Sequence, residues 1–541
     1  MTIRNPILPG FNPDPSIVRA GDDYYIATST FEWFPGVQIH HSRDLVQWEL
    51  VAHPLTRLSQ LNMEGVDDSG GVWAPCLTYS NGLFWLIYTN VKHHHGAFKV
   101  THNYLVTASE ITGPWSEPIY LNSSGFDPSL FHDDDGRKWL VNMDWEWRPN
   151  RNRFSGIILQ EYDPDAQRLT GPIERIFLGT ELGKTEGPHL YKREGYYYLL
   201  TAEGGTGFEH AVTMARSRSI GGPYEVDPEN PILTSVGHSD ATLERAGHAD
   251  IVETPDGWYL VHLCSRPIGS GIRGRAEGWS VLGRETSIQK VDWSPDGWLR
   301  LAHGGNAPAS EVPAPASLVA SDAPARAGAT GAQTGTRVFV DEFDGDSLSI
   351  HWQTLRVPLG EEAMSLSARP GYLRLFGQDP PVSRFDQSLI ARRRQAFEYE
   401  AQTSLEFGPE DYKQMAGLIC IYDTTKFHYL YVSAGELGRQ LGILSAGGGE
   451  ELFPIGGDEI GLPEAGPVHL RANVRYAELQ FSWSSDGTIW YEVGTVLDMT
   501  VLSDEMRPGG SFTGAFVGVC CQDLSGLRRH ADFKRFRYEE G

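Results

Sequence analysis

One short turn motif occurs five times in residues 1–303, and this repeat constrains the fold more than any other feature. In each copy a tight-turn dipeptide precedes alternating aromatic and aliphatic residues. The copies recur every 54 to 62 residues, beginning at Gly21, Asn81, Asp135, Glu194 and Asp256. Asn-Gly and Asp-Gly turns supply the positive φ angles that β-hairpins need. A repeat of this length, made of short strands, predicts a β-propeller with five blades.

The rest of the chain is also expected to be all-β. Helical periodicity is nearly absent, which argues against an α/β barrel, since that fold alternates helices with strands. Residues 416–422 and 468–476 alternate apolar and polar side chains, as the strands of a two-sheet sandwich do. Residues 304–336 are rich in Ala, Pro, Gly, Ser and Thr and contain no aromatic residue, which indicates a linker. The predicted organisation is a propeller over 1–303, a linker over 304–336 and a sandwich over 337–541.

Charge and cysteine content narrow the partners and the compartment. The net charge of −25 and the pI of about 5.1 disfavour nucleic acid and anionic membranes as partners. The sequence has no apolar run of about 18 residues, and residues 1–10 show no apolar signal region. The five cysteines are few, odd in number and scattered, as in reduced cytosolic proteins. These features predict a cytoplasmic protein.

Acidic residues recur at a matched place, about eight or nine residues before the turns. Asp14, Asp127 and Glu186 occupy this place in repeats one, three and four, and His248 occupies it in repeat five. Trp73 lies beside it in repeat two. A single Asp-Pro pair is a common turn former, but three carboxylates at matched phase are not the usual spacing of solvated surface charges. If each repeat is a blade, these side chains form one ring around the central channel.

Converging carboxylates suit the hydrolysis of a glycoside. Three such groups are costly to ionise together, so their pKa values separate and one acts as an acid while another acts as a base. Glycoside hydrolysis needs both roles. Aromatic side chains that could pack on sugar C–H faces lie near the ring in sequence, although packing between blades is an equally good explanation for any one of them. They are Phe31, Trp33, Trp73, Phe126, Trp145 and Trp147.

Several motifs together resemble glycoside hydrolase family 43, and specifically its β-xylosidases. The resemblance covers nearly the whole chain. The motifs are Asn5-Pro-Ile-Leu-Pro-Gly-Phe-Asn-Pro-Asp-Pro-Ser, Thr28-Ser-Thr-Phe-Glu-Trp-Phe-Pro-Gly, Gly71-Val-Trp-Ala-Pro, Gly125-Phe-Asp-Pro-Ser-Leu and Thr185-Glu-Gly-Pro-His. The C-terminal region is similar to the concanavalin-like sandwich of the same enzymes.

The resemblance implies a role for each site residue. Asp14 matches the general base that activates water, Glu186 the general acid, and Asp127 the carboxylate that orients the acid and raises its pKa. Arg284 matches an arginine that binds sugar hydroxyls. Phe512 matches a sandwich residue that reaches into the pocket and closes one side. The resemblance implies further subsite walls at Phe31, Trp73, Ala74, Phe126, Trp145, Thr206 and His248. Family members invert the anomeric centre, for which the base and acid stand about 6.5–9.5 Å apart.

The expected activity is that of an exo-acting inverting 1,4-β-xylosidase, which releases xylose from the non-reducing end of xylo-oligosaccharides. One alternative is an α-L-arabinofuranosidase or an enzyme with both activities. Another is a retaining glycosidase, with carboxylates only about 5–5.5 Å apart. An alternative of a different class is a non-catalytic carbohydrate-binding protein, which would have lost at least one of the three carboxylates.

Paired carboxylates need no metal, so no cofactor is expected to be required. His93-His94-His95 and Asp133-Asp-Asp-Gly136 lack the ligand spacing of zinc and calcium sites and indicate loops. Some relatives bind Ca²⁺ in the channel, so the resemblance allows such an ion near His248. It also implies a homo-oligomer, a tetramer or a dimer.

Overall fold

The computed structural model describes residues 1–319, 337–436, 438–448, 450–506 and 511–541. The chain divides into two compact units. The first contains Met1–Phe31, Pro35–Arg266 and the described residues 284–319. The second contains Glu32–Phe34, Pro267–Gly283 and the described residues from 337 to 541. Within these ranges no helix has the length and apolarity needed to cross a membrane.

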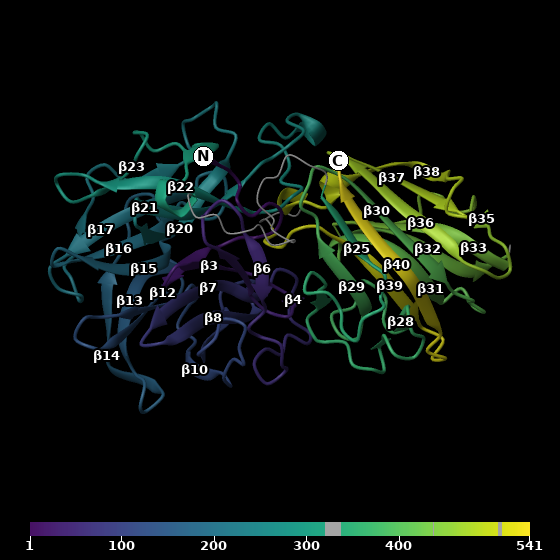
Figure 1. Cartoon of the computed structure of the whole chain (residues 1–541), viewed down its shortest axis with the longest axis horizontal. Helices are drawn as coiled ribbons and strands as arrows, with labels where there is room; N and C mark the ends of the chain where they lie inside the picture. The colour runs from purple at the N-terminus through teal and green to yellow at the C-terminus, as the bar shows by residue number, and fades with distance from the viewer. Residues whose placement is uncertain (320–336, 437, 449, 507–510) are drawn as a thin grey trace. The chain divides into compact units, whose positions relative to one another are not determined.

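The first unit is a five-bladed β-propeller, as predicted, coloured purple to teal in Figure 1. Blade 1 contains β2 (Ser16–Ala20), β3 (Asp23–Thr28), β5 (Gln38–Ser42) and β6 (Glu49–Ala52). Blade 2 contains β7 (Gly71–Ser80), β8 (Leu83–His93), β9 (Val100–Ala108) and β10 (Ile119–Asn122). Blade 3 contains β11 (Ser129–His132), β12 (Lys138–Trp145), β13 (Phe154–Asp163) and β14 (Arg168–Phe177). Blade 4 contains β15 (Glu186–Arg193), β16 (Tyr196–Glu203), β17 (Ala211–Ser217), β18 (Glu225–Val226) and β19 (Leu233–Thr234). Blade 5 contains β20 (Glu244–Thr254), β21 (Gly257–Ser265), β22 (Glu285–Trp293) and β23 (Leu299–Leu301).

The repeated turn lies between the first and second strands of every blade. Asn81 and Gly82 both have positive φ, 54° and 76°, and so do Glu194 and Gly195, 51° and 75°. Two positive φ angles in a row give the type I′ twist that suits a two-residue hairpin. The first strands β2, β7, β11, β15 and β20 contact one another in turn, and β20 contacts β2 again. The first strand is therefore the innermost one in each blade, and together the five line the channel.

The N-terminal residues close the ring against the last blade. β1 (Thr2–Arg4) pairs with β24 (Glu311–Pro313), and Leu8 bridges to Thr286 in β22. The Asn5 side chain donates to the Ile288 carbonyl (2.7 Å) and accepts from the Ile288 N–H (2.8 Å). β24 and α1 (Ala316–Val319) fall in the segment expected to be a linker, so its described part belongs to the first unit. Residues 320–336, the rest of that linker, lie outside the described residues.

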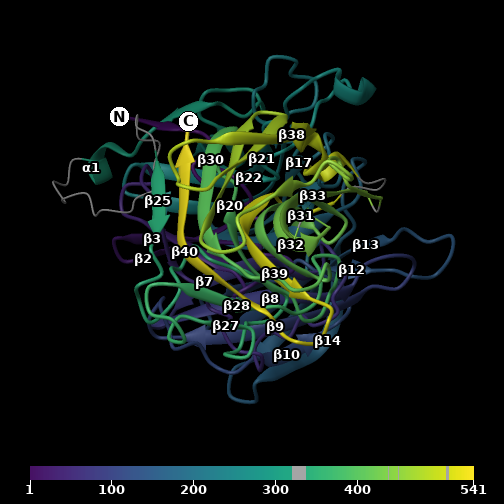
Figure 2. The ribbon, with the colours of Figure 1, turned by 90° about the vertical axis from the view of Figure 1, so that its right-hand side faces the viewer.

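The second unit is a two-sheet sandwich with a concanavalin-like fold, as predicted. Figure 2 shows its long curved strands in green and yellow. One sheet contains β25 (Val338–Asp341), β27 (Met364–Ser365), β28 (Leu373–Phe376), β30 (Glu398–Glu406), β36 (Val468–Arg475), β37 (Glu478–Ser484), β38 (Tyr491–Asp498) and β40 (His530–Glu540). The other contains β29 (Ser388–Arg393), β31 (Gln414–Asp423), β32 (Lys426–Gly435), β33 (Gly438–Gly447), β34 (Glu451–Leu452), β35 (Ile460–Gly461) and β39 (Phe516–Asp523). Residues alternate between buried and solvent-facing along β30 and β36, so the apolar halves pack between the sheets.

Two short strands and three 3₁₀ helices complete the described elements. β4 (Trp33–Phe34) pairs with β26 (Thr354–Leu355) inside the second unit, although β4 lies within the sequence of blade 1. Three single-turn 3₁₀ helices follow later, at Ile272–Gly274, Met499–Val501 and Asp504–Met506.

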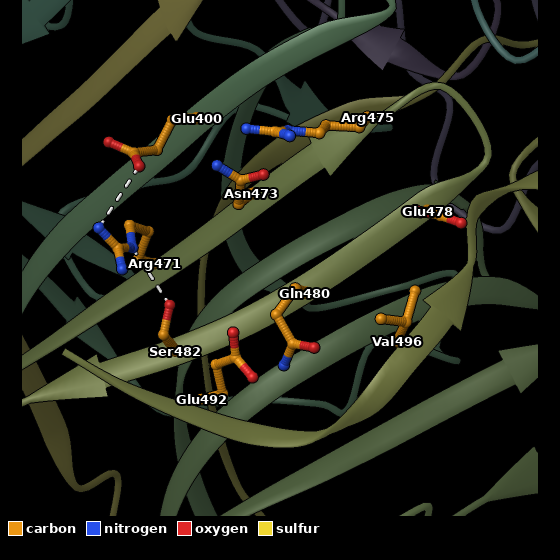
Figure 3. Close-up of a pocket in the computed structure, with 9 residues that line it drawn as sticks. All are labelled: Glu400, Arg471, Asn473, Arg475, Glu478, Gln480, Ser482, Glu492 and Val496. Atoms are coloured by element: carbon orange, nitrogen blue, oxygen red, sulfur yellow. Dashed lines mark hydrogen bonds and ion pairs between the residues drawn. The ribbon is translucent and has the colours of Figure 1, made fainter.

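A polar groove crosses the outer face of the sandwich (Figure 3). One of its arginines bonds to neighbouring strands: Arg471 lies 3.5 Å from Glu400, and its Nε donates to Ser482 Oγ at 3.1 Å. It is lined by Glu400, Arg471, Asn473, Arg475, Glu478, Gln480, Ser482, Glu492 and Val496. A groove whose charges already balance one another is typical of a solvated sheet face. The buried carboxylates that indicate a catalytic site lie instead in the propeller.

Candidate active site

One residue at the start of each innermost strand has a left-handed backbone conformation. Four of the five precede a proline. A non-glycine residue in this region costs about 1–3 kcal/mol, and such strain concentrates at functional sites, where the surrounding packing enforces it. The residues are Asp14 (φ 55°), Ala74 (32°), Asp127 (53°), Gly187 (56°) and His248 (49°). We call these five residues the inner ring.

The inner-ring residue of blade 4 is Gly187, which corrects the predicted phase of Glu186 by one residue. A Cβ at position 187 would lie 3.1 Å from the His248 ring, so this place favours glycine. The Gly187 N–H donates to Asp127 Oδ2 at 3.1 Å, which ties the strand that carries Glu186 to the neighbouring carboxylate. The proline that follows ring residues in blades 1 to 4 is the sequence signal that gives the correct phase.

Asp14 is surrounded by groups that stabilise its ionised form. Arg284 Nη1 donates to its Oδ1 at 3.1 Å, and Ser29 Oγ donates to its Oδ2 at 2.7 Å. His248 Nδ1 lies 3.8 Å from Oδ1. Burial alone would raise the pKa of Asp14, but Arg284, His248 and the Ser29 hydrogen bond together lower it below the ordinary value. Asp14 is therefore a carboxylate at neutral pH, which suits a base.

Glu186 and Asp127 have pKa values shifted in the opposite direction. Burial raises the pKa of Glu186 to about 8, and the charge of Asp14 adds to this effect. Burial, followed by the charges of Glu186 and Asp14, raises the pKa of Asp127 well above its ordinary value. Carboxyl groups that lie this close together cannot all ionise at neutral pH, so Glu186 and Asp127 keep protons while Asp14, which is bonded to Arg284, is ionised. The site thus holds an ionised carboxylate and a protonated one side by side.

Aromatic rings form a continuous row beside these carboxyl groups. Phe31 and Trp73 have ring centroids 5.9 Å apart, Trp73 and Phe126 5.4 Å, and Phe126 and Trp145 6.3 Å. Phe31 and Phe126 are buried, whereas Trp73 and Trp145 are half-buried. The two tryptophans therefore have open surface on which a sugar ring could pack.

The other predicted first-unit residues also lie at the ring. Arg284 is buried, with its guanidinium 5.1 Å from the Phe31 ring, and its Nη1 also donates to Thr206 Oγ1 at 3.2 Å. The Ala74 N–H donates to Ser29 Oγ at 2.8 Å. Ser29 therefore links the Asp14 carboxylate to blade 2. The sequence did not indicate a role for Ser29, because the residue differs from other serines only in lying two positions before Phe31.

Lys99 is a second residue that the sequence did not indicate. Its Nζ lies 4.5 Å from the centroid of the Trp145 ring and 5.9 Å from that of Trp73. It donates to the His94 carbonyl at 2.7 Å. Its positive charge opposes the rise in the pKa of Glu186, although Asp14, Arg284 and Lys184 act more strongly on that pKa. An isolated lysine in a loop carries no sequence signal for such a position.

Three other aromatic predictions have different outcomes. Phe512 is half-buried in the second unit, next to Thr513, whose hydroxyl donates to Glu32, and its role at the pocket stays a prediction. Trp33 is wholly buried in the second unit and stacks on Phe516, with centroids 3.7 Å apart, so nearness in sequence was misleading there. Trp147 is exposed and stacks on Phe98, away from the row of rings.

In the described ranges, His, Cys, Asp and Glu side chains nowhere group in threes that could hold a metal ion. His93 pairs with Asp67 at 2.7 Å, as a loop residue does. A calcium ion near His248 stays a prediction.

Comparison with known families identifies the propeller. Residues 3–299 match the family described as Glycosyl hydrolases family 43.

The chain belongs to glycosyl hydrolase family 43.

The sandwich of this family 43 chain has its own match, over residues 340–539, to the family described as Beta xylosidase C-terminal Concanavalin A-like domain. Xylosidase/arabinosidase 43B of Humicola insolens is 51% identical, covering 99% of this chain and 97% of that protein. A xylan 1,3-beta-xylosidase of a Vibrio species is 49% identical over 100% and 99% of the two chains. The crystal structure of xylan beta-1,4-xylosidase from Bacillus halodurans C-125 superposes with a TM-score of 0.94 at 53% identity, covering 99% and 100%.

The inner ring of this family 43 chain supports acid–base chemistry by two carboxyl groups whose pKa values are shifted in opposite directions. The ionised Asp14 can accept a proton from water, and the protonated Glu186 can donate one to a leaving oxygen. Arg284 and Ser29 keep Asp14 ionised, while burial keeps Glu186 neutral. Acid and base are thus available together near neutral pH.

Proposed function

We propose that this family 43 glycoside hydrolase is an exo-acting, inverting 1,4-β-xylosidase that releases xylose from the non-reducing end of xylo-oligosaccharides. The opposed pKa shifts of Asp14 and Glu186 carry the proposal. Hydrolysis with inversion needs one carboxylate and one carboxylic acid at the same pH, on opposite faces of the sugar. The names of the similar proteins support xylosides as the substrate class.

The proposed reaction is a single displacement. Asp14 takes a proton from a water molecule as that water attacks the anomeric carbon. Glu186 gives its proton to the glycosidic oxygen, and the leaving sugar departs with that proton. Asp127, whose Oδ2 accepts a hydrogen bond from the Gly187 N–H, holds the strand of the acid. The mechanism predicts that the carboxyl groups of Asp14 and Glu186 stand about 6.5–9.5 Å apart, with room for one water.

Substrate recognition follows from the row of aromatic rings and the buried arginine. We assign sugar-ring packing to Trp73 and Trp145, the two half-buried members of the row. The buried rings of Phe31 and Phe126 pack against these indoles. Arg284 can donate to a sugar hydroxyl with its other guanidinium nitrogens while it holds Asp14. The proposed subsite residues are Phe31, Trp73, Ala74, Phe126, Trp145, Thr206, His248, Arg284 and, from the sandwich, Phe512.

The first experiment compares wild type with Glu186→Ala on two β-xylosides. Xylobiose has a poor leaving group, whereas 2,4-dinitrophenyl β-D-xyloside has one that needs no protonation. We expect kcat on xylobiose to fall by at least about 100-fold in the variant, with much less loss on the activated substrate. Proton NMR of the first sugar released from xylobiose should show α-xylose. Initial release of β-xylose would replace the inverting mechanism by the retaining one.

A second activity has one observation in its favour. The relative from Humicola insolens is named for both xylosidase and arabinosidase activity. We therefore expect 4-nitrophenyl α-L-arabinofuranoside to be hydrolysed by the same site, with a lower kcat/KM than the xyloside. Glu186→Ala must abolish both activities together if they share the site. A 1,3-linked xylobiose belongs in the same panel, because the Vibrio relative is named for that linkage.

Assembly and location stay predictions. A homo-oligomer of the 60.0 kDa chain, a dimer or a tetramer, is expected, and light scattering after size-exclusion chromatography measures it directly. A cytoplasmic enzyme would act on xylo-oligosaccharides after their import into the cell. Fractionation of cells that contain the protein tests this location.

A further inference from the structure

A second ring of buried residues lies directly behind the inner ring. Each member is two residues further along an innermost strand. All five are buried, and none has more than 8% of its residue surface exposed to solvent. The members are Ser16, Cys76, Ser129, His189 and Asp250. Members of this set contact one another: Ser16 Oγ donates to Asp250 Oδ2 at 2.9 Å, and the His189 ring lies 3.9 Å from the same oxygen. We call this set the second ring.

Asp250 makes the bonds that join blade 5 to both of its neighbours in the second ring. Its Oδ2 accepts from Ser16 Oγ (2.9 Å) and from the Ile17 N–H (2.9 Å), both at the start of β2 in blade 1. Its Oδ1 accepts from the Tyr191 hydroxyl, on β15 in blade 4. The His189 ring of the same strand lies 3.9 Å from Oδ2. One carboxylate in blade 5 thus holds the innermost strands on both sides of it.

These two strands carry the acid and the base. Ser16 lies two residues after Asp14, and Tyr191 lies five residues after Glu186. Ladders of backbone hydrogen bonds run within each blade and not from β2 to β20 or from β20 to β15. The relative position of these innermost strands therefore depends on side-chain bonds across the channel, and Asp250 supplies them on both sides.

We propose that Asp250 is a positioning residue for the hydrolysis: through Ser16 and Tyr191 it fixes the distance between the strand of Asp14 and the strand of Glu186. This proposal rests on the acid and base roles proposed above. A carboxylate suits this place because every partner is a donor, whereas an asparagine would turn its NH₂ group toward either the Tyr191 hydroxyl or the Ile17 N–H. A misplacement of about 1 Å between catalytic groups costs roughly 100-fold in rate.

Loss of the Asp250 bond to Tyr191 and loss of its bond to Ser16 should have different effects on kcat. Tyr191→Phe releases the strand of the acid, so kcat on xylobiose should fall by about 10-fold or more. On 2,4-dinitrophenyl β-D-xyloside, which needs little help from an acid, the loss should stay within about threefold. Ser16→Ala releases the strand of the base, so kcat should fall by a similar factor on both substrates, because both need activated water. Asp250→Asn releases both strands, and kcat should fall by about 100-fold while KM changes by less than about threefold.

Asp227→Asn is the matched control. Asp227 is also a buried carboxylate of the propeller that ties blade 4 to blade 5, through Arg300 at 2.9 Å, but it lies at the outer strands. Both asparagine variants should have a lower Tm than wild type, yet only Asp250→Asn should lose kcat when assayed well below its Tm. A purely structural Asp250 would give a lower Tm with the kcat of the control, and that result would overturn the proposal.

Two further outcomes bear on the inference. If Asp250→Asn does not fold, the variants Ser16→Ala and Tyr191→Phe, which leave Asp250 in place, decide, and equal kcat values for both variants and wild type on xylobiose would overturn it. A loss in Tyr191→Phe that is the same on both substrates would overturn its link to the acid. Failure of the proposed function appears separately, as a wild type inactive on xylobiose or as a Glu186→Ala variant with full activity.

Discussion

Asp14 is a buried acid and Glu186 a half-buried one, yet their surroundings give them opposite protonation states. The pKa of Glu186 is raised to about 8, chiefly by burial, whereas the pKa of Asp14 is lowered by Arg284 and His248 against its burial. Hydrolysis should therefore be constant near neutral pH and fall as the pH rises through about 8, where Glu186 loses its proton. A profile of kcat against pH on xylobiose measures this limb.

Lys99 provides a test of the sign of that limb. Its positive charge favours the ionised form of Glu186 and so lowers the pKa of the acid. Removing the charge in Lys99→Met should move the basic limb to higher pH, by a few tenths of a unit. Lys192→Met is the control. Lys192, on β15 of blade 4, pairs at 2.6 Å with Asp133 in the hairpin of blade 3, so its replacement should leave the limb in place. A limb that moves to lower pH in Lys99→Met would contradict the assignment.

Asp127 is expected to reduce the stability of the folded chain at neutral pH. Burial and two neighbouring carboxylates raise its folded-state pKa well above the unfolded value. A carboxyl group with a raised folded pKa contributes stability below its unfolded pKa, and this contribution is lost as pH rises toward the folded pKa. Asp127→Asn should therefore have a higher Tm than wild type at pH 8, with a smaller difference at pH 4, and kcat at least about 100-fold lower. Calorimetry at the two pH values measures the difference, and a lower Tm at pH 8 would contradict the argument.

At the scale of elements, ring closure depends on the N-terminal strand. The side chain of Asn5 exchanges two hydrogen bonds with Ile288 and donates a third to the Ala309 carbonyl at 2.9 Å. Asn5→Ala would leave buried backbone groups of blade 5 without partners, which costs about 1–3 kcal/mol. Arg4→Ala removes only the exposed ion pair between Arg4 of β1 and Glu311 of β24, which is worth about 0–1 kcal/mol. Urea unfolding of both variants should rank Asn5→Ala as clearly the less stable.

The blades could be predicted from the sequence because their signal is local. A type I′ turn needs positive φ at two adjacent residues, so the dipeptide Asn81-Gly82 predicts a hairpin without information about distant parts of the chain. The carboxylates Asp14 and Asp127 were placed by the same repeat. Glu186 was placed one residue out of phase, because the acidic residue was aligned instead of the proline that follows the ring position.

Elements formed by distant contacts could not be predicted. Glu32–Phe34 lie within the sequence of blade 1 but belong to the second unit, where Trp33 stacks on Phe516. Nothing in the composition of these three residues indicates a partner more than 480 positions away. Lys99 and Ser29 were missed because a single lysine or serine carries no sequence signal for its contacts in the folded chain. The described part of the expected linker contains β24, which only its pairing with β1 reveals.

At the scale of the whole molecule, the cysteines report on the folding of both units. Cys76 and Cys264 lie in the first unit, and Cys420, Cys520 and Cys521 lie in the second. All five are free and buried, and burial raises the pKa of the Cys76, Cys264 and Cys520 thiols to about 12. A thiol that is buried and protonated does not react, because the nucleophile is the exposed thiolate.

The native chain should therefore consume less than about one equivalent of a thiol reagent such as 5,5′-dithiobis(2-nitrobenzoate) over an hour at pH 8, and all five thiols should react in concentrated guanidinium chloride. Along a denaturant series the number of reactive thiols gives the unfolding of each unit separately. A Cys76→Ala/Cys264→Ala variant should report only the three thiols of the second unit. Rapid reaction of any thiol in the native chain would mean that its unit opens locally far below the denaturation midpoint, with an opening free energy smaller than that of global unfolding.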